Sequence, residues 1–154
     1  MPAILFVCSA NQCRSPMAEV LFEKLLEEKG IREDWRVESA GVWAYQGAPA
    51  THNAQLVMQE RGLNLRGHRS QPADSALLKQ FDVIIVMEIE HKQTLQESNP
   101  SLADRILTIR ELVGEKGDFE DPVGGSREVY QEAADLLYDL LGKGWAEIER
   151  RTKP

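Results

Sequence analysis

A cysteine and an arginine near the start of the chain have the types and the spacing that phosphate chemistry requires. Five residues separate Cys8 from Arg14, a loop length that can wrap around one tetrahedral group and return both side chains to it. Arg14 offers a planar set of donors that can hold two phosphate oxygens at once. Cys8 would act as a thiolate, the nucleophilic form of cysteine. We therefore expect a nucleophile and an anion clamp within one loop.

The elements on either side of this loop would add to its affinity for an anion. Residues 3–7 form a continuous apolar run, typical of a strand buried on both faces of a parallel sheet. Ser15 and Pro16 have the pattern of an N-cap followed by proline at the first helical position, and they predict a helix that continues to Gly30. A loop that runs from a strand into a helix points unpaired backbone N–H groups and the positive end of the helix dipole at one place.

The rest of the chain alternates predicted strands with predicted helices. Further strands are expected at 35–39, 83–87 and 105–108, and helices at 49–62, 74–80, 91–98 and from 127 onward, the last weakened near Gly142 and Gly144. This alternation predicts a single α/β domain over residues 1–154, an open, doubly wound, four-stranded parallel sheet with helices on both faces. The ligand crevice of such a sheet lies at the C-terminal ends of its strands, where residues 8–14, the predicted phosphate loop, follow the first strand.

Composition and charge narrow the classes of partner. The 154 residues carry 18 Lys and Arg against 25 Asp and Glu, a net charge of -7, and this acidic balance makes nucleic acid and anionic membranes poor partners. No segment approaches the ~20 apolar residues needed to cross a bilayer, and no export signal is visible. Two cysteines cannot form the disulfide framework of a small secreted protein. We expect a soluble protein of the reducing cytoplasm.

Four short motifs extend the pattern along the chain. They are Cys8-Ser9-Ala10-Asn11-Gln12-Cys13-Arg14-Ser15-Pro16, Ser39-Ala40-Gly41, Gly67-His68-Arg69-Ser70 and Asp121-Pro122. On these motifs the sequence resembles the low-molecular-weight protein-tyrosine phosphatase family, whose signature is Cys-x5-Arg-Ser after the first strand with an Asp-Pro pair far downstream. The likeness covers essentially the whole chain. It implies a bacterial-type phosphatase with features similar to the protein-arginine phosphatase branch.

The resemblance implies a role for each matching residue. Cys8 would be the nucleophile that becomes a cysteinyl-phosphate, and Arg14 would clamp the equatorial oxygens of the transferring phosphoryl group. Asp121 would protonate the leaving group and then, as a base, activate the water that hydrolyses the intermediate. Ser15 would hydrogen-bond the cysteine sulfur. Asn11 would hold the strained backbone of the loop.

Other residues are expected to surround the phosphate or to support its loop. The predicted phosphate-binding set is Ser9, Ala10, Asn11, Gln12, Cys13 and Ser15, with Ser39 and His68 as supporting residues. No metal or other cofactor is expected, because Arg14 and backbone amides would neutralise the charge. The three histidines are scattered, and the two cysteines lack the second ligand pair that a structural zinc site needs.

Each candidate residue also has a structural interpretation. Cys8 alone is more often a small buried residue than a nucleophile, and Asp121 alone is a common turn residue before proline. His68 is interpreted equally well as a structural histidine or as a support for the phosphate loop. Ala10 stands where the family usually has glycine, and a positive φ angle there would cost ~1 kcal/mol. Cys13 either packs beneath the loop or captures an oxidised Cys8 as a reversible disulfide.

The expected substrate pocket leaves two substrates open. Trp43 and Tyr45 could form an aromatic wall against a phenolic ring, or could cover the core. The family resemblance favours phosphotyrosine in a phosphorylated protein as the predicted substrate. Val123-Gly124-Gly125 stands where animal members place tyrosines, and it resembles the protein-arginine phosphatase branch, as does His91-Lys92-Gln93. Gln12 fits neither branch. Phosphoarginine is therefore the alternative substrate.

The sequence gives less support to two further classes of function. Related folds include thiol-dependent arsenate reductases, but these use additional downstream cysteines, and none follows Cys13. A non-catalytic phosphopeptide-binding module would lack the nucleophile or the acid, whereas Cys8, Arg14 and Asp121 are all present. The sequence therefore predicts an enzyme and leaves its client protein and oligomeric state open.

Overall fold

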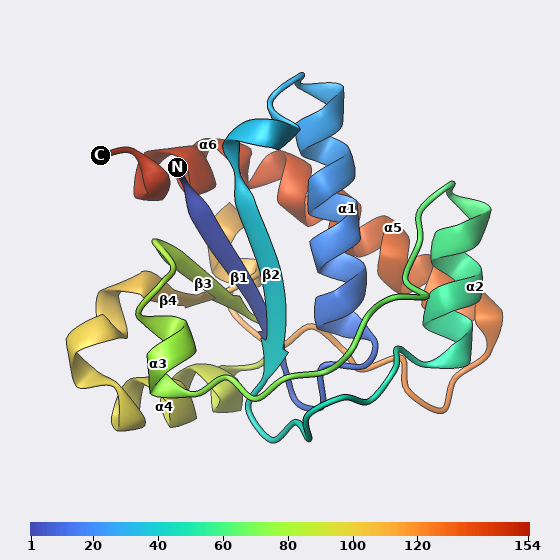
Figure 1. Ribbon diagram of the computed structural model, residues 1–154, viewed down its shortest axis with the longest axis horizontal. Helices are drawn as coiled ribbons and strands as arrows, with labels where there is room; N and C mark the ends of the chain where they lie inside the picture. The colour runs from blue at the N-terminus through green and yellow to red at the C-terminus, as the bar shows by residue number, and fades with distance from the viewer.

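Four parallel strands form the centre of the computed structural model, which describes residues 1–154. They are β1 (Ala3–Cys8), β2 (Arg36–Gly41), β3 (Val83–Val86) and β4 (Ile106–Thr108), and they lie in the order β2-β1-β3-β4 (Figure 1). The register pairs Cys8 with Gly41 and Val7 with Val86, so the central strands end at one edge of the sheet. The predicted four-stranded parallel sheet is confirmed.

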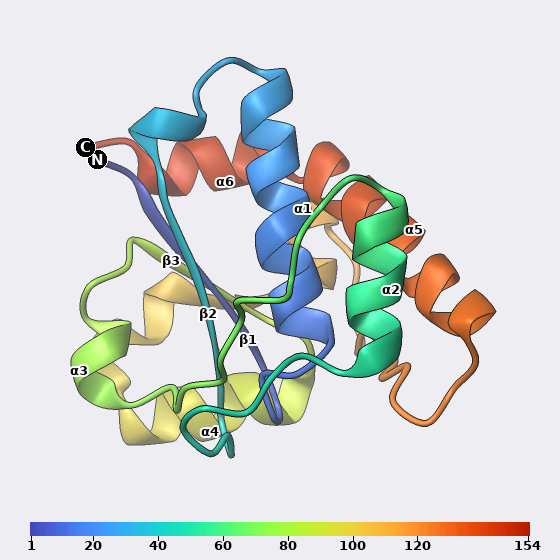
Figure 2. The same cartoon turned by 45° about the vertical axis from the view of Figure 1, so that its right-hand side comes forward.

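Six α-helices and three short 3-10 helices connect and cover the strands. The α-helices are α1 (Arg14–Glu28), α2 (His52–Glu60), α3 (Ser75–Leu78), α4 (Ile89–Ser98), α5 (Arg127–Lys143) and α6 (Trp145–Thr152). The 3-10 helices are η1 (Arg32–Asp34), η2 (Pro100–Arg105) and η3 (Arg110–Val113). Figures 1 and 2 show α1, α5 and α6 on one face of the sheet, with α2 beside α5, and α3 and α4 on the other face. None of these helices has both the length and the apolar content that crossing a bilayer requires.

The apolar run in β1 is buried along its whole length because it serves two cores. Ile4 and Phe6 point into the larger core, where Phe22 of α1 packs against Phe6. Leu5 and Val7 point into the smaller core beneath α3 and α4. Burying a side chain of this size stabilises the fold by about 1.5–3 kcal/mol. β1 is therefore anchored from both sides, and the loop that follows it starts from a fixed position.

The connections that leave β1 and β3 run over opposite faces of the sheet. α1 leads from β1 to β2 over the larger core, whereas α4 leads from β3 to β4 over the smaller one. In an open α/β sheet, a ligand crevice forms where neighbouring strands send their connections in opposite directions. β1 and β3 are such neighbours. The crevice therefore lies beside Cys8, the last residue of β1.

The predicted start of the first helix is wrong. Ser15 does not cap α1, which begins at Arg14 and has no side-chain hydrogen bond at its N-cap position. The Ser15 hydroxyl instead lies 3.0 Å from the Cys8 sulfur and accepts a hydrogen bond from the Asn11 side chain. A serine before a proline fits an N-cap in sequence, but here tertiary contacts use the hydroxyl.

Two other predicted boundaries move for similar reasons. β2 extends two residues beyond the predicted 39, to Gly41, because it pairs with β1 along its full length. α2 begins at His52 instead of 49, and the backbone N–H of Thr51 just before it donates to the Gln12 carbonyl at 2.8 Å. The segment between β2 and α2 is therefore bonded to the phosphate loop near both of its ends, through Trp43 to Ser9 and through Thr51 to Gln12.

Gly41, the last residue of β2, provides a test of how tightly the chain packs against the phosphate loop at this point. A Cβ atom at Gly41 would lie 2.7 Å from the Ser9 carbonyl oxygen and 2.9 Å from the Asn11 nitrogen, both backbone atoms. We expect Gly41→Ala to lower the free energy of unfolding by about 1–3 kcal/mol, as overpacking does, and to lower activity. Gly67→Ala is the matched control because a Cβ there meets nothing within 4 Å. Urea unfolding of both variants gives the comparison, and equal stabilities would contradict this packing.

Candidate active site

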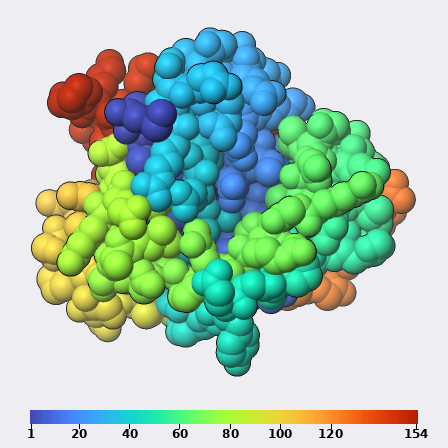
Figure 3. Space-filling model, in the orientation of Figure 1, coloured from blue at the N-terminus to red at the C-terminus, as the bar shows by residue number.

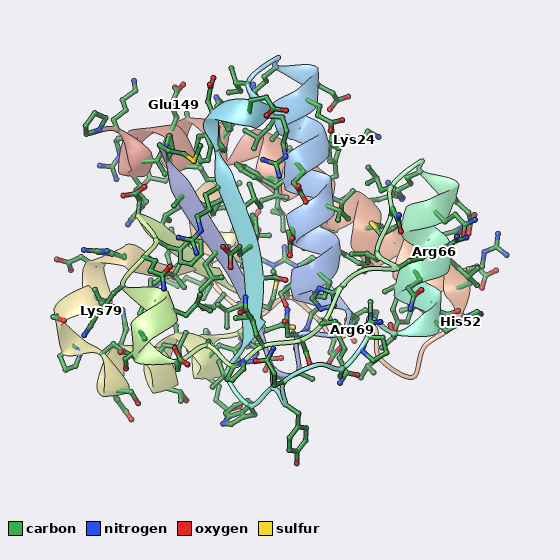
Figure 4. All side chains as sticks on the ribbon, viewed as in Figure 1. Lys24, His52, Arg66, Arg69, Lys79 and Glu149 are labelled. Atoms are coloured by element: carbon green, nitrogen blue, oxygen red, sulfur yellow. The ribbon has the colours of Figure 1, made fainter.

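The phosphate loop surrounds a small cavity at the C-terminal edge of the sheet. Cys8 lies at one end of the loop and Arg14 at the other, and the cavity between them has a volume of about 100 Å³. Its lining consists of Cys8, Ser9, Ala10, Gln12, Cys13, Arg14, Thr51, Asp121 and Val123. The loop contributes most of these residues, and the segments before α2 and α5 contribute the rest. Figure 4 places Arg69 near this end of the molecule and Lys24 and Glu149 at the opposite end.

A hydrogen-bonded pair, Asn11 and Ser15, contacts the Cys8 sulfur beneath the cavity. The Ser15 hydroxyl lies 3.0 Å from Cys8 Sγ. Asn11 Nδ2 donates to Ser15 Oγ at 2.8 Å, so the hydroxyl accepts from Asn11 and keeps its own proton for another partner. The Ala40 carbonyl is the more distant alternative acceptor at 3.3 Å. A hydroxyl that donates to sulfur favours the thiolate over the thiol.

Asn11 holds the phosphate loop in a conformation that few residues adopt. Its φ angle of 58° is the only positive value outside glycine, and asparagine tolerates this region better than most residues. The backbone N–H of Gln71 donates to Asn11 Oδ1 at 3.0 Å, and His68 Nε2 donates to the Asn11 carbonyl at 2.7 Å. Burial lowers the pKa of His68, in keeping with a neutral ring. The strain expected at Ala10 is absent because the left-handed residue is Asn11.

A carboxylate extends this hydrogen-bond network beneath the loop. Ser39 Oγ accepts from Asn11 Nδ2 at 3.0 Å and donates to Glu19 Oε1 at 2.6 Å. Burial raises the pKa of Glu19 to about 7, against the lowering effect of the Ser39 hydrogen bond and with a further rise from Glu23 and Glu38. Glu19 is thus linked through three side chains to the Cys8 sulfur.

Two nitrogens of the Arg14 guanidinium contact other residues of the protein, and the third has no partner. The side chain is 1% exposed. Nη1 donates to the Phe119 carbonyl at 2.7 Å, and Nη2 lies 2.7 Å from Glu88 Oε2 and 3.5 Å from Asp121 Oδ2. Nε is buried without a hydrogen-bond partner in the protein. Because an unpaired buried donor costs about 1–3 kcal/mol, Nε is suited to an anionic oxygen in the cavity that Arg14 lines.

Asp121 reaches the cavity from the segment before α5. Its Oδ1 accepts from the Val123 backbone N–H at 3.0 Å and from Cys13 Sγ at 3.4 Å. Burial raises the pKa of the Cys13 thiol, and the negative charges of Cys8 and Asp121 raise it further. Cys13 therefore stays a thiol that donates to Asp121, and both cysteines are free.

The residues expected to line the substrate pocket do not all meet at the cavity. Val123 lines it, whereas Trp43 and Tyr45 do not. Trp43 is 52% exposed and stands edge-on to the His91 ring. Tyr45 is 84% exposed, and its segment projects from the lower edge of the molecule in Figure 3.

Several residues at the site were not singled out for a role from the sequence. They are Glu19, Thr51, Glu88 and His91, together with the Phe119 carbonyl. The position of Glu88 after a predicted strand offered a signal, because strand ends border the crevice. No signal in the sequence identifies a backbone carbonyl as a ligand of Arg14. No three His, Cys, Asp or Glu side chains come together as a metal site would require.

The raised pKa of Glu19 predicts how the free energy of unfolding depends on pH. Its pKa is about 7 in the folded protein and 4.5 ordinarily, so between these values the folded state binds more protons than the unfolded state. The contribution to stability is therefore complete below pH 4.5 and is lost as the pH rises through 7. Relative to Glu19→Gln, wild type should lose up to about 3 kcal/mol between pH 4.5 and 8.

Urea unfolding at pH 5 and pH 8 tests this expectation. Glu27→Gln, an exposed change on the same helix, is the control and should follow wild type. Parallel pH profiles for wild type and Glu19→Gln would contradict the assignment of a buried, protonated carboxyl.

Comparison with known proteins assigns the chain to a family. A family model described as low molecular weight phosphotyrosine protein phosphatase matches residues 3–153. The protein-arginine-phosphatase of Bacillus subtilis (strain 168) is 38% identical over 139 residues, covering 90% of this chain and 91% of that protein. The probable low molecular weight protein-tyrosine-phosphatase EpsP of Ralstonia nicotianae is 34% identical over 134 residues, covering 87% of each. The structure of the low molecular weight protein tyrosine phosphatase from T. tengcongensis has a TM-score of 0.89 at 40% identity and covers 96% of this chain and 99% of that one. This chain belongs to the low molecular weight phosphotyrosine protein phosphatase family.

Proposed function

We propose that residues 1–154 work as one phosphatase domain that hydrolyses phosphotyrosine in proteins through a cysteinyl-phosphate. One observation carries the proposal: Cys8, Asp121 and Arg14, whose buried Nε is unpaired, line a single cavity of about 100 Å³. This arrangement supports roles for Cys8 as nucleophile, Asp121 as acid and Arg14 as anion clamp around a space suited to one phosphoryl group. Cys8 must stay reduced to act, which favours a reducing cytoplasm as its compartment.

In the first step the Cys8 thiolate attacks phosphorus. A sulfur–phosphorus bond forms as the bond from phosphorus to the leaving oxygen breaks, and protonated Asp121 gives its proton to that oxygen. Arg14 and the backbone N–H groups of the phosphate loop hold the equatorial oxygens, where negative charge gathers in the transition state. Ser15 donates to the sulfur, which favours its thiolate form before attack.

In the second step water releases the phosphate. Asp121, now a carboxylate, takes a proton from a water molecule whose oxygen attacks phosphorus. The sulfur–phosphorus bond breaks, and Cys8 leaves as a thiolate that Ser15 again stabilises. Inorganic phosphate departs, and Asp121 holds the proton it needs for the next cycle. One carboxyl group serves as acid and then as base.

Phosphoarginine is the second candidate substrate, and two observations favour it. Val123 lines the cavity and leads into Gly124 and Gly125, a run that carries no tyrosine to flank a phenolic ring. A relative that is 38% identical is named a protein-arginine-phosphatase. Phosphotyrosine is supported by the family and by Trp43, which is half exposed. In either case the proposed partner is a phosphorylated protein.

The assignment of nucleophile and acid is tested with aryl phosphates. Cys8→Ser should lose activity by about a thousandfold or more, because a serine hydroxyl is a weaker nucleophile than a thiolate and a poorer leaving group from phosphorus. Asp121→Ala should lose about 10²- to 10⁴-fold with phenyl phosphate. Its loss should shrink as the leaving group becomes more acidic, since a good leaving group needs no proton.

The control is Asp139→Ala, which removes an exposed carboxylate of α5 that does not line the cavity. This variant should match wild type with every aryl phosphate. Equal losses for Asp121→Ala across the whole range of leaving groups would remove Asp121 as the acid.

The choice of substrate is tested with two peptides of one sequence, one with phosphotyrosine and one with phosphoarginine at the same position. We expect a higher kcat/KM for the phosphotyrosine peptide. Trp43→Ala should raise KM for that peptide by about three- to tenfold, from the loss of aromatic contact. A large excess of phosphoarginine turnover would instead establish the alternative.

A further inference from the structure

The first turn of α4 is closed by a reciprocal pair of hydrogen bonds beside the phosphate loop. Glu88 is the N-cap residue, and its carboxylate accepts from the backbone N–H of His91. In return, the backbone N–H of Glu88 donates to His91 Nδ1 at 3.1 Å. The His91 side chain is completely buried. This capping box therefore fixes both the position and the orientation of the imidazole.

The capping box also determines which ring nitrogen carries the proton. Nδ1 accepts from Glu88, so the proton of the neutral ring lies on Nε2. Nε2 lies 2.8 Å from Ser9 Oγ and donates to it. Burial lowers the pKa of His91, and Arg14 lowers it further, against the opposing charges of Glu88, Asp118 and Asp121. These effects together favour the neutral ring.

Ser9 is the first residue after the nucleophile and lines the catalytic cavity. Its hydroxyl accepts from His91 and so keeps its own proton for another acceptor. Its carbonyl accepts from the backbone N–H of Trp43 at 3.0 Å, and the Trp43 ring stands edge-on to His91 with 5.7 Å between centroids. Ser9 is therefore held on two sides, and its free O–H can reach an oxygen of a phosphoryl group.

The same turn of α4 holds the other end of the phosphate loop. Glu88 Oε2 lies 2.7 Å from Nη2 of Arg14. The two residues of the capping box thus hold the two ends of the phosphate loop, His91 through Ser9 and Glu88 through Arg14. A shift of α4 would change the separation of the groups that contact the phosphoryl oxygens.

We propose that His91 is a positioning residue of the phosphatase reaction, which orients the Ser9 hydroxyl as a donor to the phosphoryl group. This rests on the proposed function. The contribution is that of one neutral hydrogen bond, which corresponds to a two- to tenfold effect on kcat/KM at about 0.5–1.5 kcal/mol. His91 itself does not touch the substrate. Its effect passes entirely through Ser9.

A double-mutant cycle tests this route. kcat/KM for an aryl phosphate is measured for wild type, Ser9→Ala, His91→Asn and the double variant. Asparagine can still accept from the Glu88 N–H at the helix cap, but its side chain is too short to reach Ser9. Each single change should cost about two- to tenfold, and the double variant should lose no more than the worse single variant. Gln93→Ala, an exposed change in the same helix, should match wild type.

A second readout separates positioning from a purely structural role. Protonated His91 would carry N–H at Nδ1, which faces the Glu88 N–H, so protonation must break the capping box. Wild-type kcat/KM should therefore fall at acid pH more steeply than that of His91→Asn.

Multiplicative losses in the cycle, or a His91→Asn variant that melts earlier but keeps full kcat/KM, would overturn the proposal. If His91→Asn does not fold, full activity in Ser9→Ala overturns it. Wild type with no activity on aryl phosphates would instead mean that the proposed function has failed.

Discussion

In the proposed reaction a thiolate and a phosphate dianion, two like charges, share a cavity of about 100 Å³. Their repulsion in a partly desolvated site is large, so the site must supply positive charge and hydrogen-bond donors before the substrate arrives. In this account Arg14, the N-terminus of α1 and the N–H groups of the phosphate loop supply them, and the Ser15 hydroxyl lies 3.0 Å from the sulfur. The remaining features of the structure hold these donors in place.

The supports form two groups on opposite sides of the phosphate loop. Asn11 lies at the centre of one, where its side chain contacts Ser15 and Ser39 and its carbonyl accepts from His68. The turn of α4 that begins at Glu88 forms the other and holds Arg14. Both groups start from strand ends at the same edge, because β1 lies between β2 and β3. The position of the crevice thus follows from the order of the strands.

Most of the fold could be predicted from the sequence, because buried strands and amphipathic helices are local patterns. The apolar run in β1 predicted a strand buried on both faces, and the Cys8 to Arg14 spacing predicted the loop. The role of Ser15 as an N-cap was wrong because a contact with Cys8, seven residues away, outweighs the local preference of serine. The contact of Glu88 with Arg14 joins segments far apart in the chain, and no spacing rule predicts such a pair.

The central claim is that the phosphate loop keeps Cys8, and not its neighbour Cys13, as a reactive thiolate. Iodoacetamide alkylates thiolates, and mass spectrometry of the digested protein reports the rate at each cysteine, so Cys13 serves as the control within one molecule. We predict that Cys8 reacts readily at pH 6, that inorganic phosphate protects it, and that Cys13 stays unmodified. Equal reactivity of the two cysteines at pH 6, or a Cys8 rate that phosphate does not change, would contradict the account.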